Sequence, residues 1–175
     1  MKVEYPIFWN QNQIDRIESA YKENSLIKVK EALEFIRSLP AAIQGPDINI
    51  GILRTFTLET MIDYLQLSFS IIPCKPNIFF GDFDNIEQSI LDKDSYFLRQ
   101  KPNLIFIIWR LEDIHPNLVW DIDSMSLSQR IYECEQLIER VGLLISGYSE
   151  NASLFMATFS VPSRWLGVVH DQNRT

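Results

Sequence analysis

The sequence predicts an α/β domain in which a mostly parallel sheet is covered by helices on both faces. From residue 46 onward, segments with the pattern of strands alternate with segments with the pattern of helices, and this alternation requires crossovers between parallel strands. The candidate strands are continuously apolar, which is typical of strands that are buried on both faces. The predicted strands are Ile48–Leu53, Asn77–Phe80, Leu104–Trp109 and Leu154–Thr158.

Two helices are predicted between residues 11 and 39, ahead of the first strand. Apolar residues recur there at steps of three and four, and Ser25 is a plausible break and cap between the helices. Proline and glycine then punctuate a short linker. We therefore expect a helical N-terminal extension over residues 1–45 and an α/β domain over residues 46–175. The sequence stops where one more helix and strand would be expected, so we expect this domain to be truncated at its C-terminus.

Three further helices are predicted between the strands. One spans about Leu58–Phe69, a short one begins after Asp84, and a long one runs from about Ser128 to Ile145. Ser126 and Gln129 have the spacing of a capping box for the long helix. The apolar stripe that we expect to face the core consists of Ile131, Cys134, Ile138, Val141 and Ile145.

Composition excludes several classes of function. The 175 residues include 16 lysines and arginines against 23 aspartates and glutamates, which gives a formal net charge of −7 without a basic cluster. Nucleic acid and anionic membranes are therefore not expected partners. No signal peptide or membrane-spanning run is visible, and the two cysteines are too few for a disulfide framework, so we expect a cytoplasmic protein. No His/Cys cluster has metal-ligand spacing, and no metal is predicted.

Candidate ligand-binding residues follow the predicted strands, because ligands of an open parallel sheet bind beyond the carboxyl ends of its strands. Three of them are arginines, whose guanidinium groups suit phosphate or carboxylate. The alternative for Arg110 is a simple ion pair with Glu112 or Asp113. The residues predicted to bind a ligand are Arg54, Thr57, Gly81, Asn85, Arg110, Asp113 and Arg164.

Hydrolytic chemistry has weaker support in the sequence. It needs a nucleophile, a base and an oxyanion hole, but the turn after the first strand offers only Thr55 and Thr57. His115 and His170 are the only histidines. The catalytic candidates are thus Thr55, Thr57 and Asp113. The segment "GDFDN" (81–85) superficially resembles an Asp-x-Asp phosphatase signature, but a strand end with a helix cap is the favoured interpretation.

Three segments resemble the amino-terminal domain of FkbH-like proteins: "NIGILRTFTLETMIDYL", "PNIFFGDFDNIEQSILDKDSYFLRQKPNLIFIIWRLEDI" and "VPSRWLG". The resemblance runs from about Asn49 to Gly167. Its most specific parts are Phe56–Glu59, Gly81–Phe83 and Arg110–Asp113.

The resemblance implies a flavodoxin-like, SGNH-hydrolase-like three-layer sandwich that precedes a haloacid-dehalogenase-type phosphatase domain. In such proteins a three-carbon unit from bisphosphoglycerate is dephosphorylated and loaded as glyceryl onto an acyl carrier protein during polyketide-type biosynthesis. Magnesium would belong to the phosphatase domain, so no cofactor is expected in this chain.

The sequence departs from the hydrolase pattern at the catalytic positions. Where SGNH hydrolases have Gly-Asp-Ser after the first strand, this chain has Arg54-Thr-Phe-Thr57. Where they have Gly-x-Asn-Asp, it has Arg110-Leu-Glu-Asp113, which keeps only the aspartate. Gly81 is a candidate for oxyanion stabilisation, and Asn85 and Asp113 are further candidates for the rim.

These observations favour a non-catalytic accessory domain that binds an acyl carrier protein, or a ligand of the phosphopantetheine or phosphoglycerate type. Its partners would be that carrier protein or a downstream haloacid-dehalogenase-type domain. Because carrier proteins are usually acidic too, a local arginine patch would be needed for their association. The alternatives are an SGNH-like esterase or acyltransferase with a degenerate active site, and a structural or dimerisation domain. The sequence does not predict the oligomeric state.

Overall fold

The structure is a computed structural model of the chain. The residues that it describes are 10–23, 25–39, 45–70, 74–147 and 152–157. Two compact units are present. The first comprises Met1–Ile50 and Thr57–Phe79, and the second comprises Gly51–Phe56 and Phe80–Thr175. The boundary that the sequence predicts between residues 45 and 46 stays a prediction.

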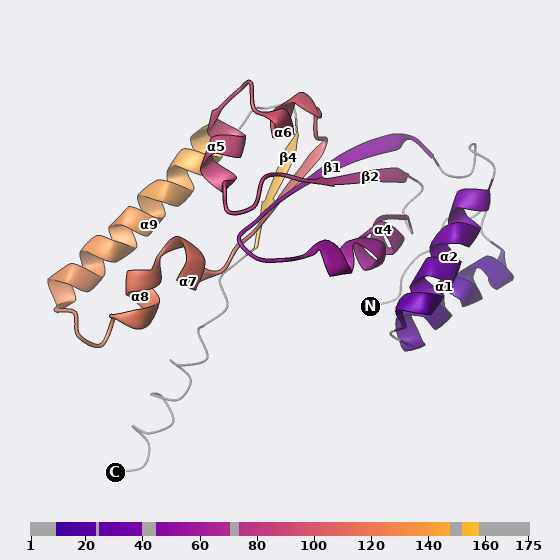
Figure 1. Cartoon of the computed structure of the whole chain (residues 1–175), viewed down its shortest axis with the longest axis horizontal. Helices are drawn as coiled ribbons and strands as arrows, with labels where there is room; N and C mark the ends of the chain where they lie inside the picture. Colours follow the sequence, from indigo (N-terminus) through magenta and orange to yellow (C-terminus); the bar gives the residue numbers. More distant parts are fainter. Residues whose placement is uncertain (1–9, 24, 40–44, 71–73, 148–151, 158–175) are drawn as a thin grey trace, which may run out of the picture. The chain divides into compact units, whose positions relative to one another are not determined.

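The predicted parallel sheet is confirmed. Its four strands lie in the order β2-β1-β3-β4, which is a flavodoxin-like topology (Figure 1). All four strands occur where continuous apolar segments predict them. The strands are β1 (Asp47–Arg54), β2 (Lys75–Phe80), β3 (Leu104–Ile108) and β4 (Ser153–Met156).

Helices precede the first strand and connect the later ones, as the sequence predicts. The helix predicted from Leu58 begins as a short 3-10 turn and continues as α4. The helical elements are α1 (Gln11–Glu23), α2 (Leu26–Ser38), η1 (Glu59–Met61), α4 (Ile62–Ser70), α5 (Ile86–Leu91), α6 (Tyr96–Arg99), α7 (Leu111–Ile114), α8 (Pro116–Trp120) and α9 (Leu127–Gly147). Among the described helices, none combines the length and the apolar character that a membrane crossing requires.

The core of the first unit joins the two N-terminal helices to α4. Helices α1 and α2 lie side by side (Figure 1), and α4 contributes Leu67 to their shared apolar cluster. Tyr21 donates a hydrogen bond of 2.9 Å to Ser68, and Arg37 donates one of 2.8 Å to Gln66. The buried members of the cluster are Ile17, Ala20, Val29, Ala32, Leu33, Ile36 and Leu67.

The core of the second unit is built on β3 and β4. Ile105 and Ile107 are fully buried, and they pair in register with Leu154 and Met156. On the alternate positions Phe106 pairs with Phe155, and the two rings stack with their centroids 5.0 Å apart. Strand pairing continues past β4, because the N–H of Ala157 donates to the carbonyl of Ile107.

Helix α9 packs on the rest of the second unit through an unexpected face. Leu144 is fully buried, and Leu137 packs against Leu111, Leu118 and Val119. The capping box at the start of α9 is confirmed, since the N–H of Ser126 donates to the Gln129 side chain and the N–H of Gln129 donates to the Ser126 hydroxyl.

The predicted inner stripe of α9 was wrong. Ile131, Ile138 and Ile145 have 50%, 71% and 55% of their surface exposed, and Cys134 is also exposed. The apolar arc of this helix is wider than the surface that the second unit covers, so periodicity identified apolar positions but not the ones that face the core.

Candidate functional site

The candidate site lies in the second unit, where β1 and β3 reach their carboxyl ends. Pairing between these strands extends one residue past β1, because the N–H of Thr55 donates to the carbonyl of Ile108 at 3.3 Å. Only 5% of Thr55 is exposed. The chain after β3 turns at once into α7, and this turn places Arg110 and Asp113 next to the end of β1.

Thr55, Arg110 and Asp113 form one hydrogen-bonded cluster. The N–H of Arg110 donates to Thr55 Oγ1 at 3.1 Å, and the Thr55 hydroxyl in turn hydrogen-bonds the Asp113 carboxylate. That carboxylate accepts two more hydrogen bonds, from Arg110 Nε at 2.8 Å and Nη2 at 2.9 Å. The cluster therefore joins the ends of two strands, and both the N–H and the hydroxyl of Thr55 take part in hydrogen bonds.

Electrostatics in this cluster favour the charged form of both ionisable groups. Partial burial of Asp113 opposes its ionisation, but the hydrogen bonds from Arg110 and Thr55 outweigh that effect and lower its pKa. The hydrogen bond to Asp113 raises the pKa of Arg110 further. Asp113 is consequently a carboxylate at neutral pH, and a weak base.

Arg110 has donors that the cluster does not use. About half of its side chain is exposed, and Asp113 engages only one edge of the guanidinium. A guanidinium carries five N–H donors, so the outer edge can donate to an added anion. The guanidinium also lies over the ring of Phe56, 5.4 Å from its centroid, which restrains its plane.

Arg54 has a different environment. It is 6% exposed, and its Nη1 donates to the carbonyl of Gly81 at 2.8 Å. Its guanidinium lies over Phe80 at 4.4 Å and over the exposed Phe83 at 5.8 Å. Arg54 thus holds the turn that follows β2, and its predicted role in ligand binding stays a prediction.

Gly81 and Asn85 line a hollow of about 250 Å³ beside that turn. Asn85 donates a hydrogen bond of 3.1 Å to Gln88. The hollow contains three carboxylates and one arginine, so it suits hydroxyl, amide or amine groups better than a phosphate. Its lining consists of Gly81, Asp82, Asn85, Gln88, Ser89, Asp92, Asp94, Ser95, Tyr96, Phe97 and Arg99.

The remaining predicted residues lie elsewhere. Thr57 is exposed and belongs to the first unit, whereas Arg164 and His170 lie outside the described residues. His115 is mostly buried, with its Nδ1 3.4 Å from a Glu133 carboxylate oxygen. In the described part of the chain, no group of three or more His, Cys, Asp or Glu side chains is placed to hold a metal ion.

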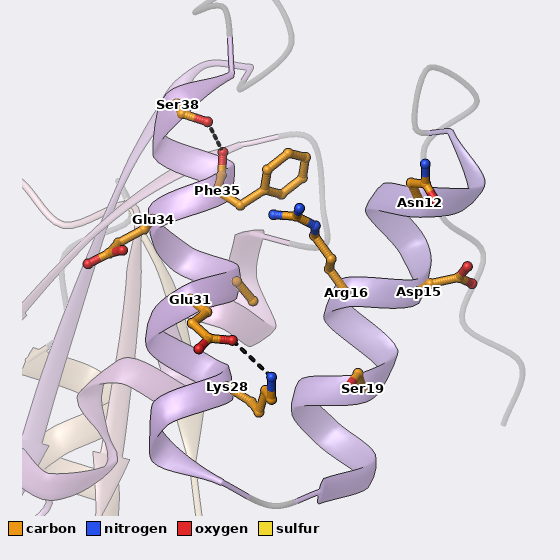
Figure 2. Close-up of a pocket in the computed structure, with 10 residues that line it drawn as sticks. Asn12, Asp15, Arg16, Ser19, Lys28, Glu31, Glu34, Phe35 and Ser38 are labelled. Atoms are coloured by element: carbon orange, nitrogen blue, oxygen red, sulfur yellow. Dashed lines mark hydrogen bonds and ion pairs between the residues drawn. The ribbon is translucent and has the colours of Figure 1, made fainter.

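A second hollow, which sequence reasoning missed, lies between α1 and α2 in the first unit (Figure 2). It is open and has a volume of about 890 Å³. Arg16 lies over the ring of Phe35 at 4.8 Å, and Lys28 forms a 3.1 Å ion pair with Glu31. No sequence signal marks this groove, because it arises from the separation of two amphipathic helices. Its mixed charges favour no single class of ligand.

The fold and the site together define a flavodoxin-like α/β domain whose carboxyl edge carries a Thr-Asp-Arg cluster. No protein-family model and no curated protein matches the sequence. A solved structure with the same fold is the N-terminal part of the protein BF1531 from Bacteroides fragilis, which contains a phosphatase domain and is complexed with Mg.

The likeness to that structure has a TM-score of 0.59 at 11% sequence identity. It covers 82% of this chain and 36% of the other, so this chain spans about a third of the matched chain. At this identity the likeness shows the shared fold.

Proposed function

We propose that this chain is a non-catalytic accessory domain of an FkbH-like biosynthetic protein, and that its carboxyl edge binds the phosphate ester of a phosphoglycerate or phosphopantetheine-type ligand. The observation that carries the proposal is the geometry of Arg110. One edge of its guanidinium is fixed by Asp113 and the other edge is open to solvent.

The fixed orientation of Arg110 favours recognition of a phosphate. Phe56 below the guanidinium and Asp113 beside it hold the plane in place before a ligand arrives, which lowers the entropy that binding costs. Asp113 also cancels the charge of Arg110, so binding depends on directed hydrogen bonds more than on net charge. We therefore expect modest affinity and easy release, which suit a domain that passes a substrate to another domain.

The state of Thr55 argues against hydrolysis. A nucleophile has to reach the substrate and pass its proton to a base. Thr55 is buried, its oxygen accepts the Arg110 N–H, and its proton faces a carboxylate with a lowered pKa. The esterase alternative rests on this Thr55–Asp113 contact. It predicts turnover of short-chain chromogenic esters that Thr55→Val abolishes; the accessory-domain proposal predicts no turnover.

The shared fold with part of a phosphatase-containing protein supports an accessory role. It agrees with the sequence segments that resemble FkbH-like proteins, in which such a domain precedes a phosphatase domain. An acyl carrier protein remains the proposed macromolecular partner. The chain carries a net charge of −7, so an acidic carrier would have to be recognised through the directed hydrogen bonds of Arg110 and not through the net charge of the domain.

Calorimetric titration with 3-phosphoglycerate and with phosphopantetheine tests the proposal. Loss of a charge-assisted hydrogen bond costs about 1.5–3 kcal/mol, so Arg110→Gln should weaken binding by about tenfold or more. Lys93→Gln removes an exposed cation elsewhere in the same unit and should leave binding unchanged. Absence of binding by both compounds, or equal affinity in Arg110→Gln, would overturn the proposal.

A further inference from the structure

Helix α9 carries a straight row of exposed apolar side chains along its solvent face. The row, called the outer stripe below, follows steps of four and three along the helix. Leu127 and Ile138, for example, have 73% and 71% of their surface exposed. Isolated exposed apolar residues are ordinary, but an aligned row on one helix is typical of an interaction surface. The outer stripe consists of the exposed residues Leu127, Ile131, Cys134, Ile138 and Ile145, with the half-buried Val141 between the last two.

The outer stripe is not needed to hold α9 in place. The helix is fixed by Leu137 and Leu144, and by Arg140, which bonds to Glu87 and to the carbonyl of Ile114. The outer stripe alternates steps of four and three residues, the pattern that lets a second helix lie along the first. Helix α9 therefore has a second apolar face, suited to packing against another helix, in addition to the face that contacts the second unit.

Charge on the flanks of the outer stripe restricts what can cover it. By helical periodicity, Leu137 and Leu144 border one flank, and that flank belongs to the covered face of α9. Glu135 and Glu139, both exposed, border the other. A helix that packs on the outer stripe therefore meets an acidic border on its accessible side.

A second copy of the chain does not fit this border. In an antiparallel two-fold pair the acidic flanks would face each other and bring Glu135 close to its own copy, and both chains carry a net charge of −7. In a parallel pair, the acidic flank would face the flank that the second unit already occupies. Like-charge contacts oppose the first arrangement and steric overlap opposes the second.

We propose that the outer stripe docks an amphipathic helix of a partner protein, with apolar residues at steps of three and four and with Lys or Arg on the flank that faces Glu135 and Glu139. The apolar side chains pack on Ile131, Cys134 and Ile138, and the basic side chains set the orientation. This surface is separate from the Arg110 site, and its charge excludes acidic carrier proteins as its ligand. The mode of recognition is that of a helix laid on an apolar helix face.

Two synthetic helical peptides of about 18 residues test the proposal. Both have leucine at steps of three and four; one has lysine flanks and the other has glutamate flanks. Fluorescence anisotropy with the full chain should show binding of the lysine peptide, weakened at least about tenfold by Ile131→Ser/Ile138→Ser. The double variant Glu135→Lys/Glu139→Lys should reverse the preference. Ile27→Ser, at an equally exposed position of α2, is the matched control and should change nothing.

Native cysteines give a second readout on the same samples. Cys134 is exposed within the outer stripe and Cys74 is buried, so the lysine peptide should slow alkylation of Cys134 alone. Binding that the Ile131→Ser/Ile138→Ser or charge-reversal variants leave unchanged would overturn the proposal. So would a Cys134 thiol that is already protected in the monomeric chain, because the chain itself would then cover the outer stripe. Sedimentation of the chain as a dimer that Ile138→Ser dissociates would show a second copy as the occupant.

Discussion

At the scale of single residues, Thr55 has the clearest structural role at the sheet edge. Its hydroxyl accepts the Arg110 N–H and donates to Asp113, and it is buried. Thr55→Val should lower the free energy of unfolding by about 1–3 kcal/mol, because it leaves the Arg110 N–H without its acceptor and removes one of the hydrogen bonds to the Asp113 carboxylate. Thr55→Ser keeps the hydroxyl and should lose less. Urea denaturation measures both, and a valine variant as stable as the parent would contradict the described network.

The lowered pKa of Asp113 predicts how the stability of the chain depends on pH. Its pKa is lowered in the folded chain, so the unfolded chain binds more protons in the window between the folded value and the unfolded value of about 3.9. Its stabilising contribution is present above that window and is lost as pH falls through the folded pKa. The difference in unfolding free energy between the parent and Asp113→Asn should be constant from pH 7 to about 5 and shrink in stronger acid. A difference that grows in acid would refute the assignment.

Gly81 is required by close approach of neighbouring side chains. A Cβ at this position would lie 2.3 Å from Leu53 Cδ2 and 3.1 Å from a ring carbon of Phe97. Gly81→Ala should therefore destabilise the chain by about 1–3 kcal/mol, as overpacking does in other cores. Thermal unfolding followed by circular dichroism measures the effect. Gly142→Ala provides the control, since nothing lies within 4 Å of a Cβ there, and an equal loss in both variants would contradict the close contact.

At the scale of elements, the two faces of α9 predict opposite responses to truncation. Leu144 is fully buried and Ile138 is 71% exposed. Leu144→Ala should cost about 2–5 kcal/mol through the cavity that it leaves, whereas Ile138→Ala should change stability by less than about 0.5 kcal/mol. Chemical denaturation of the two variants measures the contrast. A larger loss for Ile138→Ala would mean that the face predicted from the sequence is the one that packs against the core.

The sequence predicted elements better than it predicted their contacts. Continuous apolar runs located all four strands, and capping residues located the start of α9. Which arc of α9 faces inward depends on neighbours that are distant in sequence, such as Leu118 and Val119. Local periodicity carries no information about such contacts. For the same reason the sequence placed Arg54 at the rim without indicating that its guanidinium would be buried against Phe80 and the Gly81 carbonyl.

At the scale of the whole molecule, the alternation of strands and helices was enough to predict the parallel sheet. Right-handed crossovers leave few arrangements of four such strands, and the observed order β2-β1-β3-β4 is one of them. The same topology explains why Arg110 and Asp113, predicted from their position after a strand, lie next to Thr55. The Arg110–Asp113 ion pair was the alternative that the sequence offered for Arg110, and the structure confirms it. The hydrogen bonds to Thr55 were not predicted, because they depend on how β1 and β3 pair at their ends and on side-chain rotamers.

The most direct test of phosphate binding at the carboxyl edge is an NMR titration of the arginine side chains with 3-phosphoglycerate. A ¹H–¹⁵N spectrum of the guanidinium groups would be assigned with Arg110→Lys and Arg54→Lys. If the carboxyl edge binds the phosphate, the Arg110 signals should shift in a saturable manner while those of the buried Arg54 remain in place. Arg110 signals that stay unchanged at saturating 3-phosphoglycerate, or a shift confined to other arginines, would contradict a phosphate-binding edge in this domain.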